Sequence, residues 1–182
     1  GASNQYTRYY AESYDRQETA SGFKEWTYIT APNGLCAVYY NNNGTTQLNY
    51  VLSDNLGSPV LITSSNSTPG IIEQYSFDSW GRRRNPTDWS YNNIPVPQQM
   101  IRGYTLHEHL DEFAMINMNG RIYFLFFGRF IQTDNLEQDA NNMQKYNSFA
   151  YCSNNPLRYT DPTGHYGEDP IYGFYSSNYY SY

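Results

Sequence analysis

Turn signals at short intervals are the feature that most constrains the fold of this chain. Ala31-Pro-Asn-Gly34 and Asn41-Asn-Asn-Gly44 separate short segments rich in β-branched and aromatic residues. Asn-Gly pairs adopt the positive φ values that tight β-hairpin turns need. The segment Thr46–Leu52 then alternates, which is typical of a half-buried strand. One face of that strand carries Leu48, Tyr50 and Leu52, and the other face carries Gln47 and Asn49.

Several other segments predict further strands. They are a strand near Thr7–Ala11, followed by a loop through Ser21-Gly22, and strands at Lys24–Thr30, Leu35–Tyr40, Val60–Thr63, Ile71–Phe77, Ala114–Met118 and Arg121–Phe127. The Asn119-Gly120 turn gives the last two the strongest hairpin signal. Residues 85–99 contain three prolines and are expected to form an irregular excursion.

One segment, Asp139–Cys152, predicts a helix. Asp139 can cap its first turn, and Asn154-Asn155-Pro156 would end it. The expected fold is mainly β: an antiparallel β-hairpin strip with one short helix in its C-terminal part. We expect residues 1–165 to form one domain, because this length can bury a real core, and residues 166–182 to form a short Tyr-rich tail.

Composition agrees with a β protein and excludes some partners. The aromatic share is 18%, with 21 Tyr against 9 Phe, and such rings fit half-exposed sheet faces. The net charge of −6 argues against nucleic acid or an anionic membrane as the main partner. No apolar run reaches the roughly 20 residues that cross a bilayer, so membrane insertion is not expected. The chain begins without Met and without a signal peptide, so we expect a trimmed chain.

Two cysteines, Cys36 and Cys152, lie far apart in the sequence. In an exported protein they could pair, and closing a loop of about 100 residues would stabilise the fold by up to roughly 4–5 kcal/mol. Two cysteines do not make a disulfide framework, however, so the sequence favours two separate buried thiols.

Five short motifs follow one another between Asp54 and Gly164. Tyr75-Ser-Phe-Asp-Ser-Trp-Gly-Arg82 is similar to the YD repeat, and Asp54-Asn-Leu-Gly-Ser58 resembles the Asp-His-Leu-Gly-Ser motif of the same proteins. The others are Arg121-Ile-Tyr123, Gly128-Arg129-Phe130 and Asn154-Asn-Pro156 through Asp161-Pro162-Thr-Gly164. Together, in this order, they resemble the RHS repeat-associated core domain. The family-motif residues are Asp54, Gly57, Tyr75, Asp78, Gly81, Arg82, Arg121, Tyr123, Gly128, Arg129, Phe130, Pro156, Asp161, Pro162 and Gly164. The match covers roughly residues 24–165.

The resemblance implies a large secreted or surface-displayed bacterial protein built from β-hairpins that wind into a strip. In full-length relatives the strip encloses a C-terminal toxin, and the core domain closes the shell. In several relatives this domain also cuts the chain as an aspartic autoprotease. It therefore implies an extracellular or cell-surface location and, as partner, the rest of a larger RHS-type polypeptide or a neighbouring protein.

Some residues depart from the family pattern. Autocleaving relatives carry a first Asp-Pro-x-Gly where this chain has Asp134-Asn-Leu-Glu137, and the usual Leu after the second motif is His165. Tyr123-Phe-Leu125 replaces a common Tyr-Asp-Pro. Residues 166–182 are too few for a toxin domain, and this length is too short for a complete shell.

An Asp134/Asp161 pair is the sharpest candidate for chemistry. Two carboxylates that share a proton can activate water, and Arg129 could stabilise negative charge. The alternative is that both acids cap turns by accepting local N–H groups. Because the Pro and Gly after Asp134 are lost, the turn interpretation is favoured. Cleavage, if it occurred, should fall shortly after Gly164.

Two other clusters permit a site but do not require one. His107-Glu108-His109 with Asp111 could ligate zinc or nickel, but no third ligand has a recognisable spacing, so we expect a hydrogen-bonded surface turn and no metal. Arg82-Arg-Arg84 could bind phosphate, but on an acidic chain it is expected to pair with local acids or cap the repeat. No nucleophile–base pair, phosphate loop or dinucleotide motif occurs, so no cofactor is expected.

The favoured function is therefore structural: a scaffold or closing plug for export, display or toxin presentation. Self-cleavage is the enzymatic alternative. Binding of glycans or cell surfaces through exposed Tyr and Trp, with Trp26, Trp80 and Trp89 as platforms, is a third. A strip of hairpins also exposes sheet edges, so we expect self-association or an edge covered by the tail.

Overall fold

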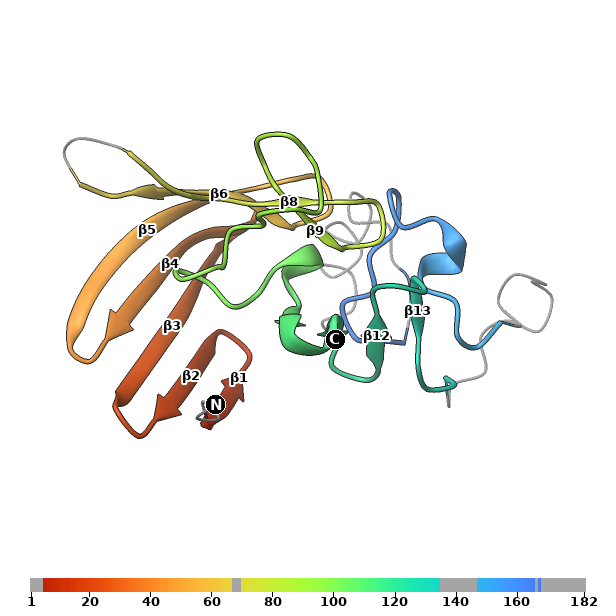
Figure 1. The fold of residues 1–182 in the computed structure, drawn as a ribbon, viewed down its shortest axis with the longest axis horizontal. Helices are drawn as coiled ribbons and strands as arrows, with labels where there is room; N and C mark the ends of the chain where they lie inside the picture. The colour runs from red at the N-terminus through yellow and green to blue at the C-terminus, as the bar shows by residue number, and fades with distance from the viewer. Residues whose placement is uncertain (1–4, 67–69, 135–146, 166, 168–182) are drawn as a thin grey trace, which may run out of the picture. The chain divides into compact units, whose positions relative to one another are not determined.

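A computed structural model describes residues 5–66, 70–134, 147–165 and 167. The chain forms two compact units (Figure 1). Unit 1 comprises Gly1–Leu52, Val60–Gln74 and Pro97–Met100, and unit 2 comprises Ser53–Pro59, Tyr75–Val96 and Ile101–Tyr182. The tail from residue 168 onward lies outside the described residues, so its expected role at a sheet edge stays a prediction.

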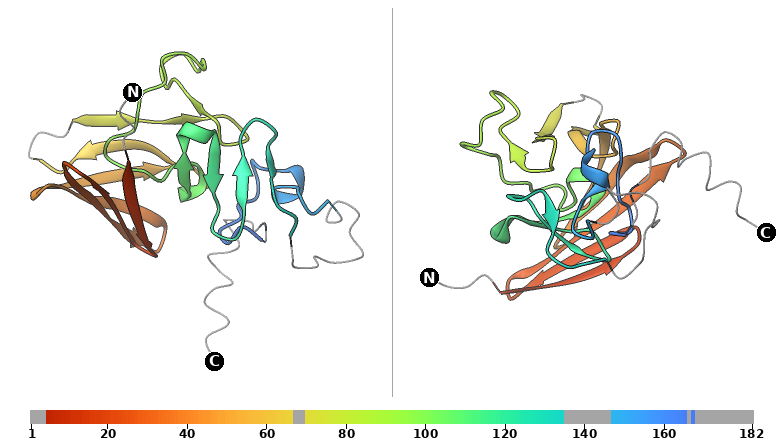
Figure 2. Two further views of the ribbon diagram at one scale, coloured as in Figure 1. Left: turned by 60° about the horizontal axis from the view of Figure 1, so that its bottom comes forward. Right: turned by 90° about the vertical axis from the view of Figure 1, so that its right-hand side faces the viewer.

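Unit 1 is built on a seven-stranded sheet whose strand order follows the sequence, as the hairpin signals predict (Figures 1 and 2). Its strands are β1 (Tyr6–Ala11), β2 (Tyr14–Thr19), β3 (Gly22–Ala31), β4 (Gly34–Asn42), β5 (Thr45–Ser53), β6 (Pro59–Ser64) and β7 (Ile71–Gln74). The β4–β5 turn is Asn43-Gly44, and both residues have positive φ, 51° and 91°. The mainly antiparallel hairpin strip is confirmed.

Strand β2 falls where the sequence suggested a loop, which is wrong for Tyr14–Thr19. The residues of this strand are mostly polar, so its sequence shows no hydrophobic alternation. In the structure several of them form polar contacts instead. Arg16 pairs with Glu18 and Glu25, and the Tyr14 hydroxyl donates to Glu25 at 2.8 Å. One of these ion pairs, Arg16 with Glu25, joins β2 to β3, and the other, Arg16 with Glu18, lies within β2. Polar contacts therefore stabilise this strand in place of an apolar face.

The half-buried strand β5 buries the face that carries Asn49. Asn49 is fully buried, and its Nδ2 donates to Gln99 Oε1 at 3.0 Å, while Val51 beside it is also buried. Tyr50 and Leu52, on the apolar-looking face, are about half exposed. The neighbouring strands determine which face of β5 is buried. Val38 on β4 pairs with Asn49, Tyr28 on β3 pairs with Val38, and Trp26 lies on the same face of β3; all three are buried.

Unit 2 contains two small sheets joined by turns. One pairs β8 (Ser76–Phe77) with β9 (Arg83–Arg84). The other has β10 (Glu108–Leu110), β11 (Met115–Asn117), β12 (Ile122–Phe124) and β13 (Arg129–Phe130) in order. Short 3-10 turns lie at η1 (Tyr104–Leu106), η2 (Asp111–Phe113) and η4 (Cys152–Asn154). The core contains Leu56, Tyr104, Ile116, Met118, Tyr123, Leu125, Phe130, Tyr151 and Cys152.

Strand β12 is shorter than the predicted Arg121–Phe127. The backbone turns back after Phe124, whose carbonyl accepts the N–H of Gly128 at 3.0 Å, and Gly128 has a φ of 60°. Residues 85–96 form an irregular loop as expected.

The helix expected over 139–152 is not formed in its described part. Asp139–Tyr146 lie outside the described residues, and 147–152 form a turn followed by a bridge. Ala150 bridges Arg129, the Phe149 carbonyl accepts the N–H of Phe130 at 3.0 Å, and the Ser148 carbonyl accepts that of Asp134 at 3.2 Å. These backbone groups extend the pairing of β13, which overrides helix propensity.

Both cysteines are free. Cys152 is buried as expected, but Cys36 is exposed, with its thiol 3.1 Å from the carbonyl of Ile29. No helix among the described residues is long and apolar enough to span a membrane.

Candidate functional site: an arginine between two aspartates

Three turns of unit 2 share the pattern Asp-x-x-Gly. In each, the Asp Oδ1 accepts the backbone N–H four residues later: Asp54 from Ser58 at 2.8 Å, Asp78 from Arg82 at 2.9 Å and Asp161 from His165 at 2.9 Å. The glycines Gly57, Gly81 and Gly164 have φ values of 81°, 87° and 78°. A short acid that bonds its own backbone and a glycine that accepts positive φ define the turn. Asp161 is therefore a turn cap.

The third turn lies against the Asn119-Gly120 hairpin. A Cβ on Gly164 would be 2.8 Å from the Gly120 nitrogen and 2.9 Å from the Arg121 nitrogen, so only glycine fits. The Gly120 N–H donates to the Thr163 carbonyl at 2.9 Å, and Asn119 Nδ2 donates to the Pro162 carbonyl at 2.9 Å. The backbones of the two turns are thus in direct contact.

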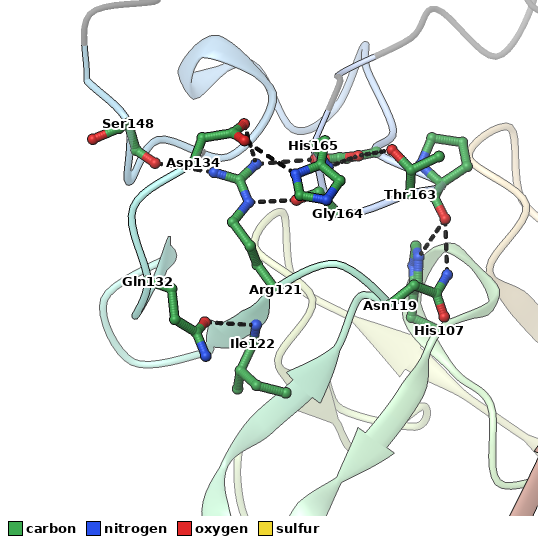
Figure 3. A network of polar contacts seen from close by, with 12 residues as sticks. His107, Asn119, Arg121, Ile122, Gln132, Asp134, Ser148, Thr163, Gly164 and His165 are labelled. Atoms are coloured by element: carbon green, nitrogen blue, oxygen red, sulfur yellow. Dashed lines mark hydrogen bonds and ion pairs between the residues drawn. The ribbon is translucent and has the colours of Figure 1, made fainter. Parts of the chain in front are cut away.

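Arg121 lies at the centre of this contact (Figure 3). Its Nε donates to the Gly164 carbonyl, and its Nη1 donates to the Ser148 carbonyl at 3.0 Å. Its Nη2 lies 3.2 Å from Asp134 Oδ2 and 3.5 Å from Asp161 Oδ2. The side chains of Arg121, Asp134 and Asp161 are 4%, 4% and 1% exposed, so a buried cation faces two buried acids.

The apolar surroundings act on this guanidinium. Burial lowers the pKa of Arg121, and the charges of Asp134 and Asp161 act in the opposite direction. The guanidinium also lies 3.6 Å from the centroid of the Phe130 ring, which can offer a cation–π contact. The geometry is that of a permanently charged group fixed by fork-like hydrogen bonds.

His165 completes the cluster. Its Nδ1 lies 3.0 Å from Asp134 Oδ1, and its backbone N–H donates to Asp161 (Figure 3). The Gly164–His165 peptide group is therefore held at both ends: Arg121 contacts its carbonyl oxygen and Asp161 accepts from its nitrogen. A guanidinium on a carbonyl oxygen polarises that carbonyl, and two carboxylates nearby are the groups that acid–base chemistry would use.

The structure brings Asp134 and Asp161 to the same guanidinium nitrogen, but that guanidinium belongs to Arg121. Arg129, the arginine chosen from the sequence, is exposed, and its backbone pairs with Phe124 and Ala150. Both arginines follow a glycine, so the local motif does not separate them. The sequence signal that could have identified Arg121 is its position directly after the Asn119-Gly120 turn. In the structure, Gln132 Oε1 accepts the N–H of the next residue, Ile122.

His107 and His109 are buried, so the surface turn expected from the sequence is wrong. They lie 6% and 3% exposed, in and beside the short strand β10. His107 Nε2 faces the Pro162 carbonyl at 3.4 Å and Nδ1 faces the Thr105 hydroxyl at 2.9 Å, which assigns the proton to Nε2. Burial lowers the pKa of His107 to about 4.

His109 has the opposite tautomer. Its Nε2 accepts the N–H of Tyr104 at 3.0 Å, so its proton lies on Nδ1, 3.4 Å from Asp111 Oδ1. Burial and then the charge of Arg83 lower the pKa of His109 to about 4. Within residues 5–66, 70–134, 147–165 and 167, no three His, Cys, Asp or Glu side chains form a group that could hold a metal ion.

The three arginines of 82–84 interact locally. Arg83 is buried, and its Nε donates to Asp111 Oδ1 at 3.1 Å. Arg84 donates to the Phe77 carbonyl at 2.6 Å, and Arg82 lies 3.9 Å from the centroid of the Tyr91 ring. Burial alone would raise the pKa of Asp111, but His109 and Arg83 together lower it to about 2. Arg83 thus pairs with an acid, but that acid lies 28 residues further along the chain and not beside the arginines as expected.

The other motif residues serve packing. Tyr123 is fully buried and its hydroxyl donates to the Trp80 carbonyl at 3.0 Å, while Phe130 packs against it edge to face. The Pro156 carbonyl accepts the Tyr104 hydroxyl at 3.1 Å. Tyr75 is buried, 5.8 Å from the guanidinium of Arg83.

Two curated proteins resemble the chain over part of its length. Salivary gland surface protein 1 of Aedes aegypti is 28% identical over 137 residues, which are 75% of this chain and 4% of that protein. The tRNA nuclease WapA of Bacillus subtilis (strain 168) is 28% identical over 106 residues, 58% of this chain and 4% of that protein. The chain thus spans a small fraction of each relative. No family model matches it.

Solved structures of TcdB2-TccC3 contain the same fold. A chain of TcdB2-TccC3 without its hypervariable C-terminal region aligns with 90% of this chain at a TM-score of 0.63 and 20% identity. A chain of the TcdB2-TccC3-Cdc42 structure aligns with 93% at a TM-score of 0.63 and 17% identity. In both, the match covers 8% of the larger chain. The fold of this chain is therefore RHS-like.

Proposed function

We propose that this chain is a structural module of a larger RHS-type polypeptide, in which it acts as a scaffold or closing plug for export, display or toxin presentation. The observation that carries the proposal is the set of contacts made by Arg121. One buried side chain contacts Asp134, Ser148, Asp161 and Gly164, from three separate stretches of chain. It fastens the segment at 147–165 to the β10–β13 sheet.

The likeness to 8% of TcdB2-TccC3 chains supports a role as a small part of a larger protein. The motif resemblance supports an extracellular or surface-displayed polypeptide, with the remaining RHS-type chain or a neighbouring protein as partner. Outside the cell, the segment at 147–165 must stay packed against the β10–β13 sheet so that proteases do not cleave it.

Limited proteolysis of the purified chain tests this role. Arg121→Met removes every contact of the guanidinium, so cleavage within 147–165 should become at least tenfold faster, because the segment opens more often. Arg129→Met, the same change at an exposed position of β13, should leave the rate unchanged. Equal cleavage rates in the two variants would remove the support for a fastening role.

Self-cleavage is a second candidate, favoured by one specific observation. The Gly164–His165 peptide has Arg121 Nε on its carbonyl oxygen and Asp161 at its nitrogen. Asp134 lies beside Nη2 of the same guanidinium, as Asp161 does. Two carboxylates that share a proton can direct water at such a carbonyl.

Intact-mass measurement after long incubation between pH 4 and pH 8 separates the two functions. Self-cleavage predicts a product that ends shortly after Gly164 and is absent from Asp161→Asn and Asp134→Asn. Asp78→Asn alters the same type of turn away from Arg121 and should still cleave. The structural function alone predicts an unchanged mass in all four proteins.

A further inference from the structure

Asn-Gly pairs occupy the β3–β4, β4–β5 and β11–β12 turns: Asn33-Gly34, Asn43-Gly44 and Asn119-Gly120. Such a pair can modify itself. The glycine nitrogen, once its proton is lost to water, attacks the asparagine Cγ, and ammonia leaves as a succinimide ring forms. Water then opens the ring at either carbonyl, which gives aspartate or isoaspartate. One neutral amide thus becomes one carboxylate, with no change of oxidation state.

The reaction needs freedom of both groups. The side chain must rotate until Cγ meets the glycine nitrogen, and that nitrogen must give up its proton, so a hydrogen bond made by either group slows the attack. Asn33 is exposed, and its side chain makes no hydrogen bond within the described part of the chain. Its side chain is therefore free to rotate toward Gly34.

Asn43 is held within its own sheet. Its Oδ1 accepts the N–H of Phe23 at 2.7 Å, and its Nδ2 donates to Asn42 Oδ1 at 3.2 Å. The Gly44 N–H donates to Asn41 Oδ1 at 2.9 Å. Both reacting groups are engaged by neighbouring strands, so this pair should react slowly while unit 1 is folded.

Asn119 is held by a distant segment instead. Its Nδ2 donates to the Pro162 carbonyl at 2.9 Å (Figure 3), 43 residues away in the sequence. The Gly120 N–H donates to the carbonyls of Thr163 and Met118, each at 2.9 Å. Asn119 and Gly120 are exposed, so water can reach them. The docked 161–164 turn therefore restrains the asparagine side chain and also engages the glycine nitrogen.

The glycine that permits this contact also makes the pair reactive. A Cβ at Gly120 would lie 2.7 Å from the Thr163 carbonyl oxygen and 2.3 Å from His165 Nε2, so a larger residue could not keep the two turns together. A side chain at this position would also shield the nitrogen from the asparagine Cγ. The close packing thus requires a residue that leaves Asn119 open to attack whenever the turns separate.

We propose that Asn119-Gly120 is a self-modification site, held unreactive by the docked 161–164 turn and released when that turn undocks. The proposal rests on the structural role given above to the segment at 147–165. Conversion of Asn119 replaces the donor that faces the Pro162 carbonyl with an acceptor, so the turn cannot dock again with the same bonds. Deamidation makes an opened module stay open.

Peptide mapping of the whole chain during incubation at mildly alkaline pH measures the three conversions. In the native chain Asn33 should convert fastest, and Asn43 and Asn119 should convert at least about tenfold more slowly, because each must first open locally. In urea the three rates should become similar. Native conversion of Asn119 at the rate seen in urea would overturn the proposal.

Arg121→Met separates the proposal from the structural role. It should raise the rate at Asn119 roughly tenfold, in step with proteolysis of 147–165, while Asn43 keeps its native rate and reports that unit 1 stays folded. Faster proteolysis with an unchanged rate at Asn119 would refute the proposal and leave the structural role intact. If proteolysis is unchanged as well, the fastening role fails, and the comparison of the native chain with the chain in urea still decides the proposal.

Asn119→Asp reproduces the charged product. Asp accepts the positive φ of this position, 66°, much as Asn does, so backbone strain adds little. Loss of one hydrogen bond should make proteolysis within 147–165 about fivefold faster. Asn33→Asp adds the same charge at an exposed turn and should leave that rate unchanged. A wild-type rate in Asn119→Asp would show that the conversion does not keep the turn open.

Discussion

Arg121 and Asp161 lie forty residues apart in the sequence and meet inside unit 2, with 3.5 Å between Nη2 and Oδ2. Asp134 shares the same guanidinium nitrogen at 3.2 Å. Both aspartates would lose their cationic partner if the guanidinium were removed. A buried charge without a partner lowers the stability of the fold, so this one arginine stabilises both acids.

Replacement of Arg121 by Met should therefore lower the free energy of unfolding by about 3–5 kcal/mol, the cost of breaking a buried ion pair from one side. Urea unfolding followed by circular dichroism measures the loss. Arg129→Met is the matched control at an exposed site and should stay within about 0.5 kcal/mol of the original chain. A loss in Arg121→Met no larger than in the control would contradict the buried-cluster geometry.

Alanine substitutions at Gly164 and Gly57 distinguish the cost of backbone strain from the cost of a steric collision. Both glycines end an Asp-x-x-Gly turn with similar φ, 78° and 81°. Alanine at Gly57 meets nothing within 4 Å and should cost only the strain of positive φ, about 1–2 kcal/mol. Alanine at Gly164 would also collide with the backbone of Gly120 and Arg121, so it should cost at least about 2 kcal/mol more. Equal losses in thermal or urea unfolding would contradict the close turn-to-turn contact.

Stability should fall as the pH drops from about 6.5 to about 4. The folded pKa values of His107 and His109 are lowered from 6.5 to about 4 because burial disfavours the charged form. The unfolded chain therefore binds more protons than the folded chain between pH 4 and pH 6.5. The contribution of the two histidines to stability is complete above pH 6.5 and is lost as the pH falls towards 4. Each histidine contributes up to roughly 3 kcal/mol.

Urea midpoints between pH 4 and pH 8 measure that slope. His109→Gln keeps an acceptor near the Tyr104 N–H but cannot titrate, so its slope should be shallower than that of the original chain. Arg83, Asp111 and Arg102 face the pair, and Asp111 stays charged down to the acid end of the window because its pKa is about 2. An unchanged slope in His109→Gln would show that other groups cause the acid loss.

The two thiols should differ in reactivity. Cys36 is exposed, whereas Cys152 is buried and burial raises the pKa of its thiol. Because the thiolate is the reactive form, iodoacetamide should label the native chain once, at Cys36, and twice only after denaturation. Peptide mapping identifies the labelled residue. Native labelling of Cys152 at a comparable rate would mean that unit 2 opens readily.

The sequence by itself determined the hairpin order of the strands, because turn chemistry is local: Asn43-Gly44 and the Asp-x-x-Gly turns need only their own residues to fix φ. It also singled out Asp134 and Asp161. The tertiary structure alone decided that Arg121 rather than Arg129 meets them, that β5 buries Asn49 rather than Tyr50, and that His107 and His109 are buried. These outcomes depend on which segments pack together across long separations, and packing between distant segments leaves no periodic signal in either one.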